Sequence, residues 1–261
     1  MTCAMPVLNS GIGWDGQLSI YDSDHENGHK RLNKNLADLG SLSIAQIFHA
    51  GMRADKRYVT DKVGPSSDIE TDTREMTVEE VQKLKTAFVD CALRAEKCGY
   101  HGVEIHAAHG YLIGQFLSKD TNKRLDKYGG SFENRTRILF EILEEIQQET
   151  TQDFLIGVRL SPEKFGLDIN EMIVLYKKLC QKTDIHFIDT IQDRFGNIIF
   201  SNDNFTSQSN VKNINAFPWL DTLEMSTKKP YYILDPLNEK ERVIDERISF
   251  LIEDVLKGFM K

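Results

Sequence analysis

The sequence predicts an α/β protein built on a parallel β-sheet, and two observations lead to this fold class. Short strand-like runs recur as far as about residue 190, and segments with the apolar spacing of amphipathic helices separate them. Strands that alternate with helices pair in parallel through right-handed crossovers. The alternation fits both a closed β/α barrel and an open doubly wound sheet, and the residues alone leave both open.

Four strands and three helices make up this alternation. The strand-like runs lie at residues 42–48, 101–106, 154–160 and 185–191. Thr77 and Glu80 have the spacing of a capping box, which predicts the start of a helix there. The apolar face of that helix repeats at intervals of three and four residues, at Val81, Leu84, Phe88, Cys91 and Ala95. A second helix is indicated by Leu139, Ile142, Leu143 and Ile146, and Asp168 is expected to cap a third that ends near Cys180.

Composition narrows the classes of function. With 261 residues, of which 40% are hydrophobic, the chain can bury a sizeable core. A net charge of −8 argues against nucleic acid or an anionic membrane surface as the main partner. We expect a cytoplasmic protein, because there is no signal-peptide pattern and no apolar run near the roughly 20 residues that span a bilayer. The four cysteines have no zinc-ligand spacing, so they are predicted to be buried, reduced side chains.

A polar cluster follows the run at 101–106. In a β/α barrel the active site forms at the carboxyl ends of the strands, so His106, His109 and Tyr111 would project into it. Two neutral imidazoles can donate hydrogen bonds to one oxygen, and a tyrosine can supply a proton. The same cluster also fits a structural role, in which one histidine caps a loop, the other is buried and bonded, and the tyrosine belongs to the core.

Two further strands carry polar side chains. The first places Gln46 within the strand and His49 just after it, and the third contains Arg159 among apolar residues. An unpaired buried arginine would cost several kcal/mol, so Arg159 is expected to meet an anion or a strong acceptor. A structural salt bridge would satisfy it equally. A metal-dependent hydrolase using Glu104, His106 and His109 is permitted by strand alternation, but Gln46 and Arg159 add no metal ligands to it.

Three motifs resemble the old yellow enzymes, also called NADH:flavin oxidoreductases. They are QIFHAG at residues 46–51, VEIHAAHGYL at 103–112 and SKDTNKRLDKYGGSFENR at 118–135. They occur in the order and at the spacing of that family, and the resemblance extends over about residues 1–191. It implies a (β/α)8 TIM barrel, here incomplete, in which strands resembling the family's second to sixth are recognisable. Residues 1–192 would form this barrel portion, and residues 193–261 a divergent, partly irregular segment that ends in a helix.

The resemblance also implies roles for individual residues. Gln46 would hydrogen-bond the pyrimidine edge of FMN, and Arg159 would lie at N1 and O2 of the flavin, where negative charge gathers on reduction. Ala4 would lie where the family's second strand passes close to the flavin. His106 and His109 would hold the substrate oxygen, and Tyr111 would be the proton donor. No metal is implied.

The implied activity is an FMN-dependent reduction of α,β-unsaturated carbonyl compounds or related electrophiles, with NADH or NADPH as hydride donor. The chain departs from the family in two places, since it starts within the second strand and has no recognisable glycine-rich phosphate site after Gly196. We therefore keep an alternative, a non-catalytic remnant with weak or absent FMN binding. A barrel that lacks strands exposes unpaired edges, which invites either aggregation or pairing in a homo-oligomer.

Overall fold

The computed structural model describes residues 1–182 and 185–190, and within them one parallel sheet dominates. Its strand order is β1-β2-β5-β6-β7, and all four strand pairs are parallel. The strands are β1 (Met5–Pro6), β2 (Ile44–Phe48), β5 (Gly102–Ala107), β6 (Leu155–Leu160) and β7 (Phe187–Thr190). The four predicted strands are therefore confirmed, and neighbours in the sheet follow one another along the chain, as they do in a β/α barrel. The segment 193–261 lies outside the described residues.

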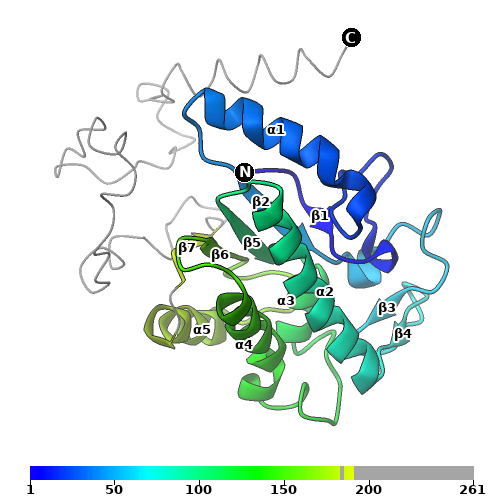
Figure 1. Cartoon of the computed structure of the whole chain (residues 1–261). Helices are drawn as coiled ribbons and strands as arrows, with labels where there is room; N and C mark the ends of the chain where they lie inside the picture. Colours follow the sequence, from blue (N-terminus) through cyan, green and yellow to red (C-terminus); the bar gives the residue numbers. More distant parts are fainter. Residues whose placement is uncertain (183–184, 191–261) are drawn as a thin grey trace, which may run out of the picture.

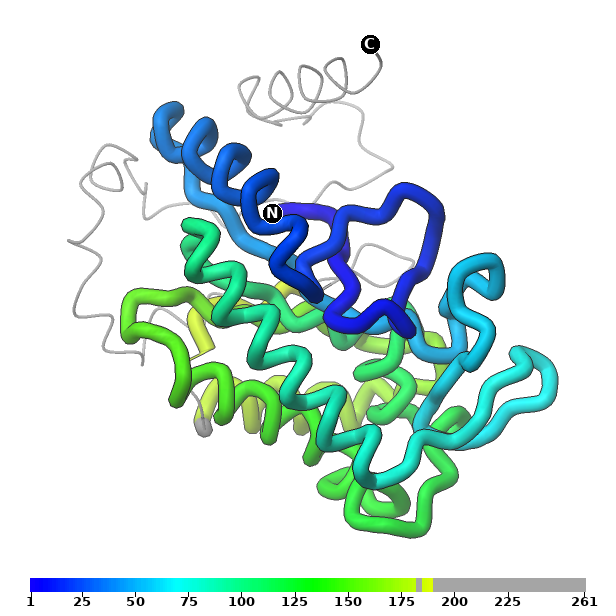
Figure 2. Tube along the Cα trace, turned by 45° about the vertical axis from the view of Figure 1, so that its right-hand side comes forward, coloured from blue at the N-terminus to red at the C-terminus, as the bar shows by residue number. Residues whose placement is uncertain are grey.

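Helices connect the strands. They are α1 (Glu26–Asp38), α2 (Val78–Lys97), α3 (Leu112–Leu117), α4 (Phe132–Glu149) and α5 (Ile169–Lys182). Short 3-10 turns lie at η1 (Asn9–Gly11), η2 (Ser23–His25) and η3 (Gly51–Arg53), and a two-residue parallel ladder joins β3 (Val63–Gly64) to β4 (Arg74–Glu75). Figures 1 and 2 show α1 at the β1–β2 end of the sheet and α5 at the β6–β7 end. No helix in the described part of the chain is long and apolar enough to cross a membrane.

The predicted helix starts are confirmed by their caps. The Thr77 hydroxyl accepts from the Glu80 amide and the Glu80 carboxylate accepts from the Thr77 amide, so both halves of the capping box form. Asp168 Oδ1 accepts from the amides of Asn170 and Glu171 at the start of α5. Helix α1 was not predicted, because the only side chains it buries are the polar His29 and Asn33.

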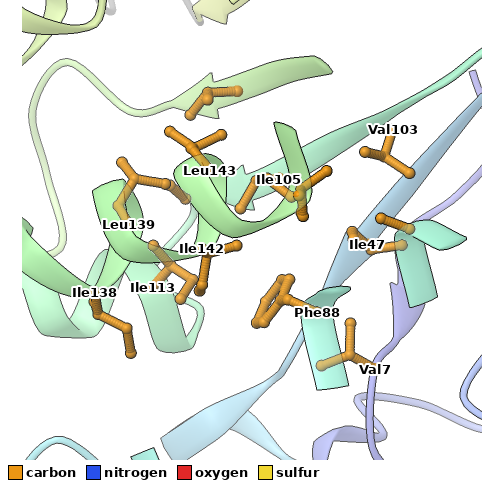
Figure 3. Close-up of a cluster of buried hydrophobic side chains, with 14 of the residues drawn as sticks. Val7, Ile47, Phe88, Val103, Ile105, Ile113, Ile138, Leu139, Ile142 and Leu143 are labelled. Carbon is orange, nitrogen blue, oxygen red and sulfur yellow. The ribbon is translucent and has the colours of Figure 1, made fainter. Parts of the chain in front are cut away.

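One face of the sheet packs on the helices, and we call it the outer face. It contributes Ala45, Ile47, Val103, Ile105, Val158 and Ile188 to a buried cluster with apolar residues of α2, α4 and α5. Figure 3 shows side chains from the sheet, α2 and α4 in this cluster. Cys91 and Cys98 are buried in it as expected, whereas the expectation was wrong for Cys3 and Cys180, which are exposed.

The opposite, inner face carries polar side chains. The strand register pairs Gln46 with Glu104, His106 with Arg159, and Arg159 with Asp189. Because side chains alternate along a strand, these five residues all project from the inner face. A second apolar cluster that includes Ala4 and Phe48 lies beside them. The fold therefore gathers the predicted polar residues on one surface of the sheet.

Candidate active site

Gln46 and Glu104 meet across neighbouring strands near the middle of the inner face. Gln46 Nε2 donates a hydrogen bond to Glu104 Oε2 at 2.5 Å. The carboxyl of Glu104 is completely buried, and its Oε1 has no hydrogen-bond partner. Burial raises the pKa of Glu104 to about 7, although the Gln46 hydrogen bond and the positive charge of Arg159 both act to lower it. The carboxyl therefore titrates close to neutral pH.

Arg159 lies on β6 with an anion beside it. Its Nη1 is 3.4 Å from Asp189 Oδ2 on β7, and its side chain is 26% exposed. Arg159 was expected to meet an anion, and the Asp189 carboxylate provides one, in a pair that is only partly buried. Its Nε is nevertheless buried and has no hydrogen-bond partner. One donor of this guanidinium thus remains for an acceptor that the described residues do not supply.

His106 and His109 form a directed hydrogen-bond chain. The Ala108 amide donates to His106 Nδ1 at 3.2 Å, which fixes Nδ1 as an acceptor. Burial, then the charges of His109 and Arg159, lower the pKa of His106 to about 3, so its ring is neutral and carries its proton on Nε2. That Nε2–H lies 3.1 Å from His109 Nδ1, which must then accept. The chain ends on His109 Nε2–H.

The sequence had suggested that both imidazoles donate to one oxygen, and this arrangement differs. In the described part of the chain the N–H of His106 is used by His109, so only His109 keeps a free donor. Burial, then the charges of Arg159 and Arg53, lower the pKa of His109 as well, which keeps it neutral at neutral pH. His109 lies in the left-handed region at φ 57°. Its backbone amide donates a hydrogen bond to Ser161 Oγ, which holds this conformation.

Tyr111 lies against this histidine pair. Its ring centroid is 5.0 Å from that of His106 and 4.9 Å from that of Phe48, edge to face in both cases. Arg53 covers the Tyr111 ring at 5.6 Å and donates to the His109 carbonyl oxygen. The Tyr111 hydroxyl makes no hydrogen bond within residues 1–182 and 185–190, so its proton is available to a ligand.

The loops after β2 and β5 are fastened together behind these groups. Gln115 of α3 donates to the carbonyl oxygens of Ala50 and Gly110 and accepts from the Met52 amide. At Gly51 φ is +61°, and a Cβ there would lie 2.3 Å from Gln115 Oε1, so only glycine fits. His49 is buried and bonds Ser10 and the Gly51 amide, which makes it a loop residue outside the site.

The structure therefore brings together all the predicted site residues on or beside one face. Ala4 is buried there, with its carbonyl oxygen accepting from Gln17. Asp189 and Arg53 were missed, since a lone acidic residue in a strand and an arginine in a loop carry no pattern that marks a site. Glu104, His106 and His109 do not gather as metal ligands, and no group of three such side chains does so within the described residues.

Comparisons with known proteins identify the family to which the chain is similar. Residues 1–228 match the NADH:flavin oxidoreductase / NADH oxidase family. The chain is 36% identical over 194 residues to a probable NADH-dependent flavin oxidoreductase of Bacillus subtilis, a match that covers 70% of this chain and 52% of that protein. It is 38% identical over 155 residues to an NADH oxidase of Thermoanaerobacter brockii, covering 57% of this chain and 24% of that protein.

The fold is similar to that of a solved old yellow enzyme homologue from Zymomonas mobilis. The TM-score is 0.66 at 27% identity, over 72% of this chain and 58% of that one. The chain thus spans between about a quarter and somewhat over half the length of these relatives. Its five parallel strands correspond to part of the (β/α)8 barrel of these enzymes. The chain belongs to the NADH:flavin oxidoreductase / NADH oxidase family, the family of the old yellow enzymes.

Proposed function

We propose that this chain is an FMN-dependent oxidoreductase that uses NADH or NADPH to reduce α,β-unsaturated carbonyl compounds. The observation that carries the proposal is that Gln46 and Arg159 lie on one face of the sheet with the cluster of His106, His109 and Tyr111. When bound, FMN supplies the transfer of a hydride from the nicotinamide to the substrate.

The side chains of the inner face favour FMN as the cofactor, because their hydrogen-bonding groups suit the pyrimidine part of a flavin. The buried Nε of Arg159 lacks an acceptor, and the carbonyl oxygens of an isoalloxazine are acceptors. Gln46 Nε2 already donates to Glu104, and the Gln46 carbonyl oxygen is an acceptor that would complement the N–H of an imide edge. The guanidinium would also stabilise negative charge on the reduced ring. Ala4 is small and buried beside Phe48, which favours close approach of a flat ring.

The substrate end of the site follows from the available protons. His109 Nε2–H is the donor at the end of the histidine chain, and it would hold the carbonyl oxygen of the substrate. His106 would act through His109 by fixing its tautomer. Tyr111 would give its hydroxyl proton to the α-carbon, since that hydroxyl has no partner in the part of the chain that the structure describes. Hydrogen bonds that strengthen as charge develops on the oxygen accelerate the reaction.

Anaerobic stopped-flow absorbance tests the proposal in two half-reactions. The chain loaded with FMN is first mixed with NADH or NADPH, and the reduced protein is then mixed with 2-cyclohexenone. We expect the flavin absorbance to bleach in the first step and to return in the second. FMN that binds but is never reduced would contradict the activity. A chain that retains no FMN would favour the alternative, a non-catalytic remnant of the family.

A further inference from the structure

Glu104 is a buried acid to which the proposed reaction gives no role. It lies directly across from Gln46 in the register of β2 and β5, and none of its surface is exposed. Carboxylates are rarely buried without a charged partner, because desolvation costs several kcal/mol. The described residues provide no cation within ion-pair distance of Glu104, since Arg159 pairs with Asp189 instead. Among the described residues, the side chain of Glu104 is hydrogen-bonded by the Gln46 amide alone.

This contact decides which way the Gln46 amide faces. An amide group is nearly symmetrical in shape, but one end donates and the other accepts. At a pH above its pKa of about 7 Glu104 is an ionised carboxylate that can only accept, so it then selects the orientation in which Gln46 Nε2 faces β5. The carbonyl oxygen Oε1 of Gln46 then faces away from Glu104, and no residue among those described donates to it. The second Nε2 hydrogen points to Met1 Sδ, a weak acceptor at 3.7 Å.

We propose that Glu104 is a positioning residue that presents the Gln46 carbonyl oxygen to the imide N3–H of the flavin. This inference rests on the proposed function and adds a ligand requirement to it, namely a flavin whose N3 carries a hydrogen. The groups around Glu104 are the Gln46 amide, the Arg159 guanidinium, the Asp189 carboxylate and the α-amino group of the chain. Glu104 Oε1 is buried without a hydrogen-bond partner, which lowers the stability of the fold and favours a functional role for this acid.

The test compares Glu104→Gln with a matched variant and uses two probes. The probes are FMN and FMN methylated at N3, and the measurement is the Kd from flavin fluorescence quenching. Glutamine keeps the shape of Glu104 but can turn either end of its amide toward Gln46. The variant therefore no longer selects one orientation of the Gln46 amide. Glu141→Gln makes the same change on α4, where Glu141 pairs with Lys85 of α2.

We expect the wild type and Glu141→Gln to bind FMN about tenfold more tightly than the N3-methyl form, as one lost hydrogen bond implies. Glu104→Gln should lose about tenfold in FMN affinity and most of this preference, while Glu104→Asp, which keeps an acceptor-only group, should recover part of it. In a Gln46→Leu background, Glu104→Gln should change neither affinity. An unchanged preference in a folded Glu104→Gln variant would overturn the proposal.

A second measurement separates this inference from the proposed function. The side-chain amide of Gln46 is followed by ¹⁵N NMR in the flavin-free chain, with Gln46→Leu giving the assignment. We expect one strongly shifted amide proton that moves in Glu104→Gln and stays in place in Glu141→Gln. If the wild type binds no FMN but shows this signal, the proposed function fails while the orientation of Gln46 stands. If the signal is the same in all three proteins, Glu104 does not orient Gln46.

Discussion

The two faces of the sheet satisfy their side chains in opposite ways. On the outer face, Ile47, Ile105 and Val158 are fully buried in the apolar cluster between the sheet and the helices. On the inner face, Glu104 Oε1 and Arg159 Nε are buried without hydrogen-bond partners. Buried polar atoms normally find partners, because each one left unsatisfied costs about 1–3 kcal/mol. The difference fits the proposed function, in which the outer face supplies stability and the inner face binds FMN.

The largest effect is expected on the outer face. Ile105→Ala removes a completely buried side chain between the sheet and the helices, and we expect a loss of about 4 kcal/mol in the free energy of unfolding. Urea denaturation followed by circular dichroism measures it. A loss below about 1 kcal/mol would mean that this face can collapse around the cavity, and the comparison between the faces would fail.

Glu104→Gln on the inner face is expected to raise the free energy of unfolding, whereas Ile105→Ala lowers it. The pKa of Glu104 is raised from 4.5 to about 7 on folding, so the folded state holds its proton more tightly between these values. Stability of the wild type therefore falls as pH rises through this window, by about 3 kcal/mol at most. Glu104→Gln lacks this loss, so its free energy of unfolding relative to the wild type should increase from pH 4.5 to pH 8, as measured by urea titrations.

Glu141→Gln is the control for this pH dependence. Burial acts to raise the pKa of Glu141, but hydrogen bonds from Lys85 and Tyr128 outweigh it and leave the pKa lowered. The sign is therefore reversed: this variant should lose stability relative to the wild type as pH rises from the lowered pKa to 4.5, and the difference should then stay constant up to pH 8. If the stability of both variants depended on pH in the same way, Glu104 would not be a buried carboxyl with a raised pKa.

Tyr111→Phe should act on one half-reaction alone. Removing a proton donor slows proton transfer by at least about a hundredfold, so reoxidation of the reduced protein by 2-cyclohexenone should slow by that factor. Reduction by NADH or NADPH needs no proton from Tyr111 and should stay within about twofold of the wild type. Stopped-flow absorbance measures both rates. Equal slowing of the two would remove Tyr111 from its assigned role.

The smallest effect is expected at Asp189. Asp189 neutralises part of the Arg159 charge at 3.4 Å, and the pair is partly exposed, so its strength is about 1 kcal/mol. Asp189→Asn should free that charge for the reduced flavin and raise the potential of bound FMN by about 20 mV. Spectroelectrochemistry measures the shift. A lower potential would show that Asp189 helps to orient Arg159 more than it opposes its charge.

The sequence predicted the outer face well because its signals are local. The capping box at Thr77 and the apolar spacing along α2 and α4 determine where those helices lie, and the structure confirms them. The inner face needed the sheet register. Alternation along β5 showed that Glu104 and His106 share a face, but only the pairing of strands shows that Gln46 meets Glu104 and that Asp189 meets Arg159. Contacts between residues that are far apart in the sequence cannot be predicted from the local spacing of residue types.

The direction of the histidine hydrogen bonds was equally hidden from the sequence. Two histidines three residues apart predicted a shared oxygen ligand, whereas the Ala108 amide forces His106 to donate to His109. Backbone amides have the same chemistry at every position, so this contact depends on the turn after β5 and on His109 adopting a positive φ.

The most direct test of a flavin site on the inner face is the visible absorption spectrum of the purified chain. The chain is incubated with excess FMN, and the free flavin is then removed by gel filtration. We predict that stoichiometric flavin absorbance stays with the wild-type protein and is lost in Gln46→Leu combined with Arg159→Leu. A folded wild-type chain that emerges colourless would contradict the account.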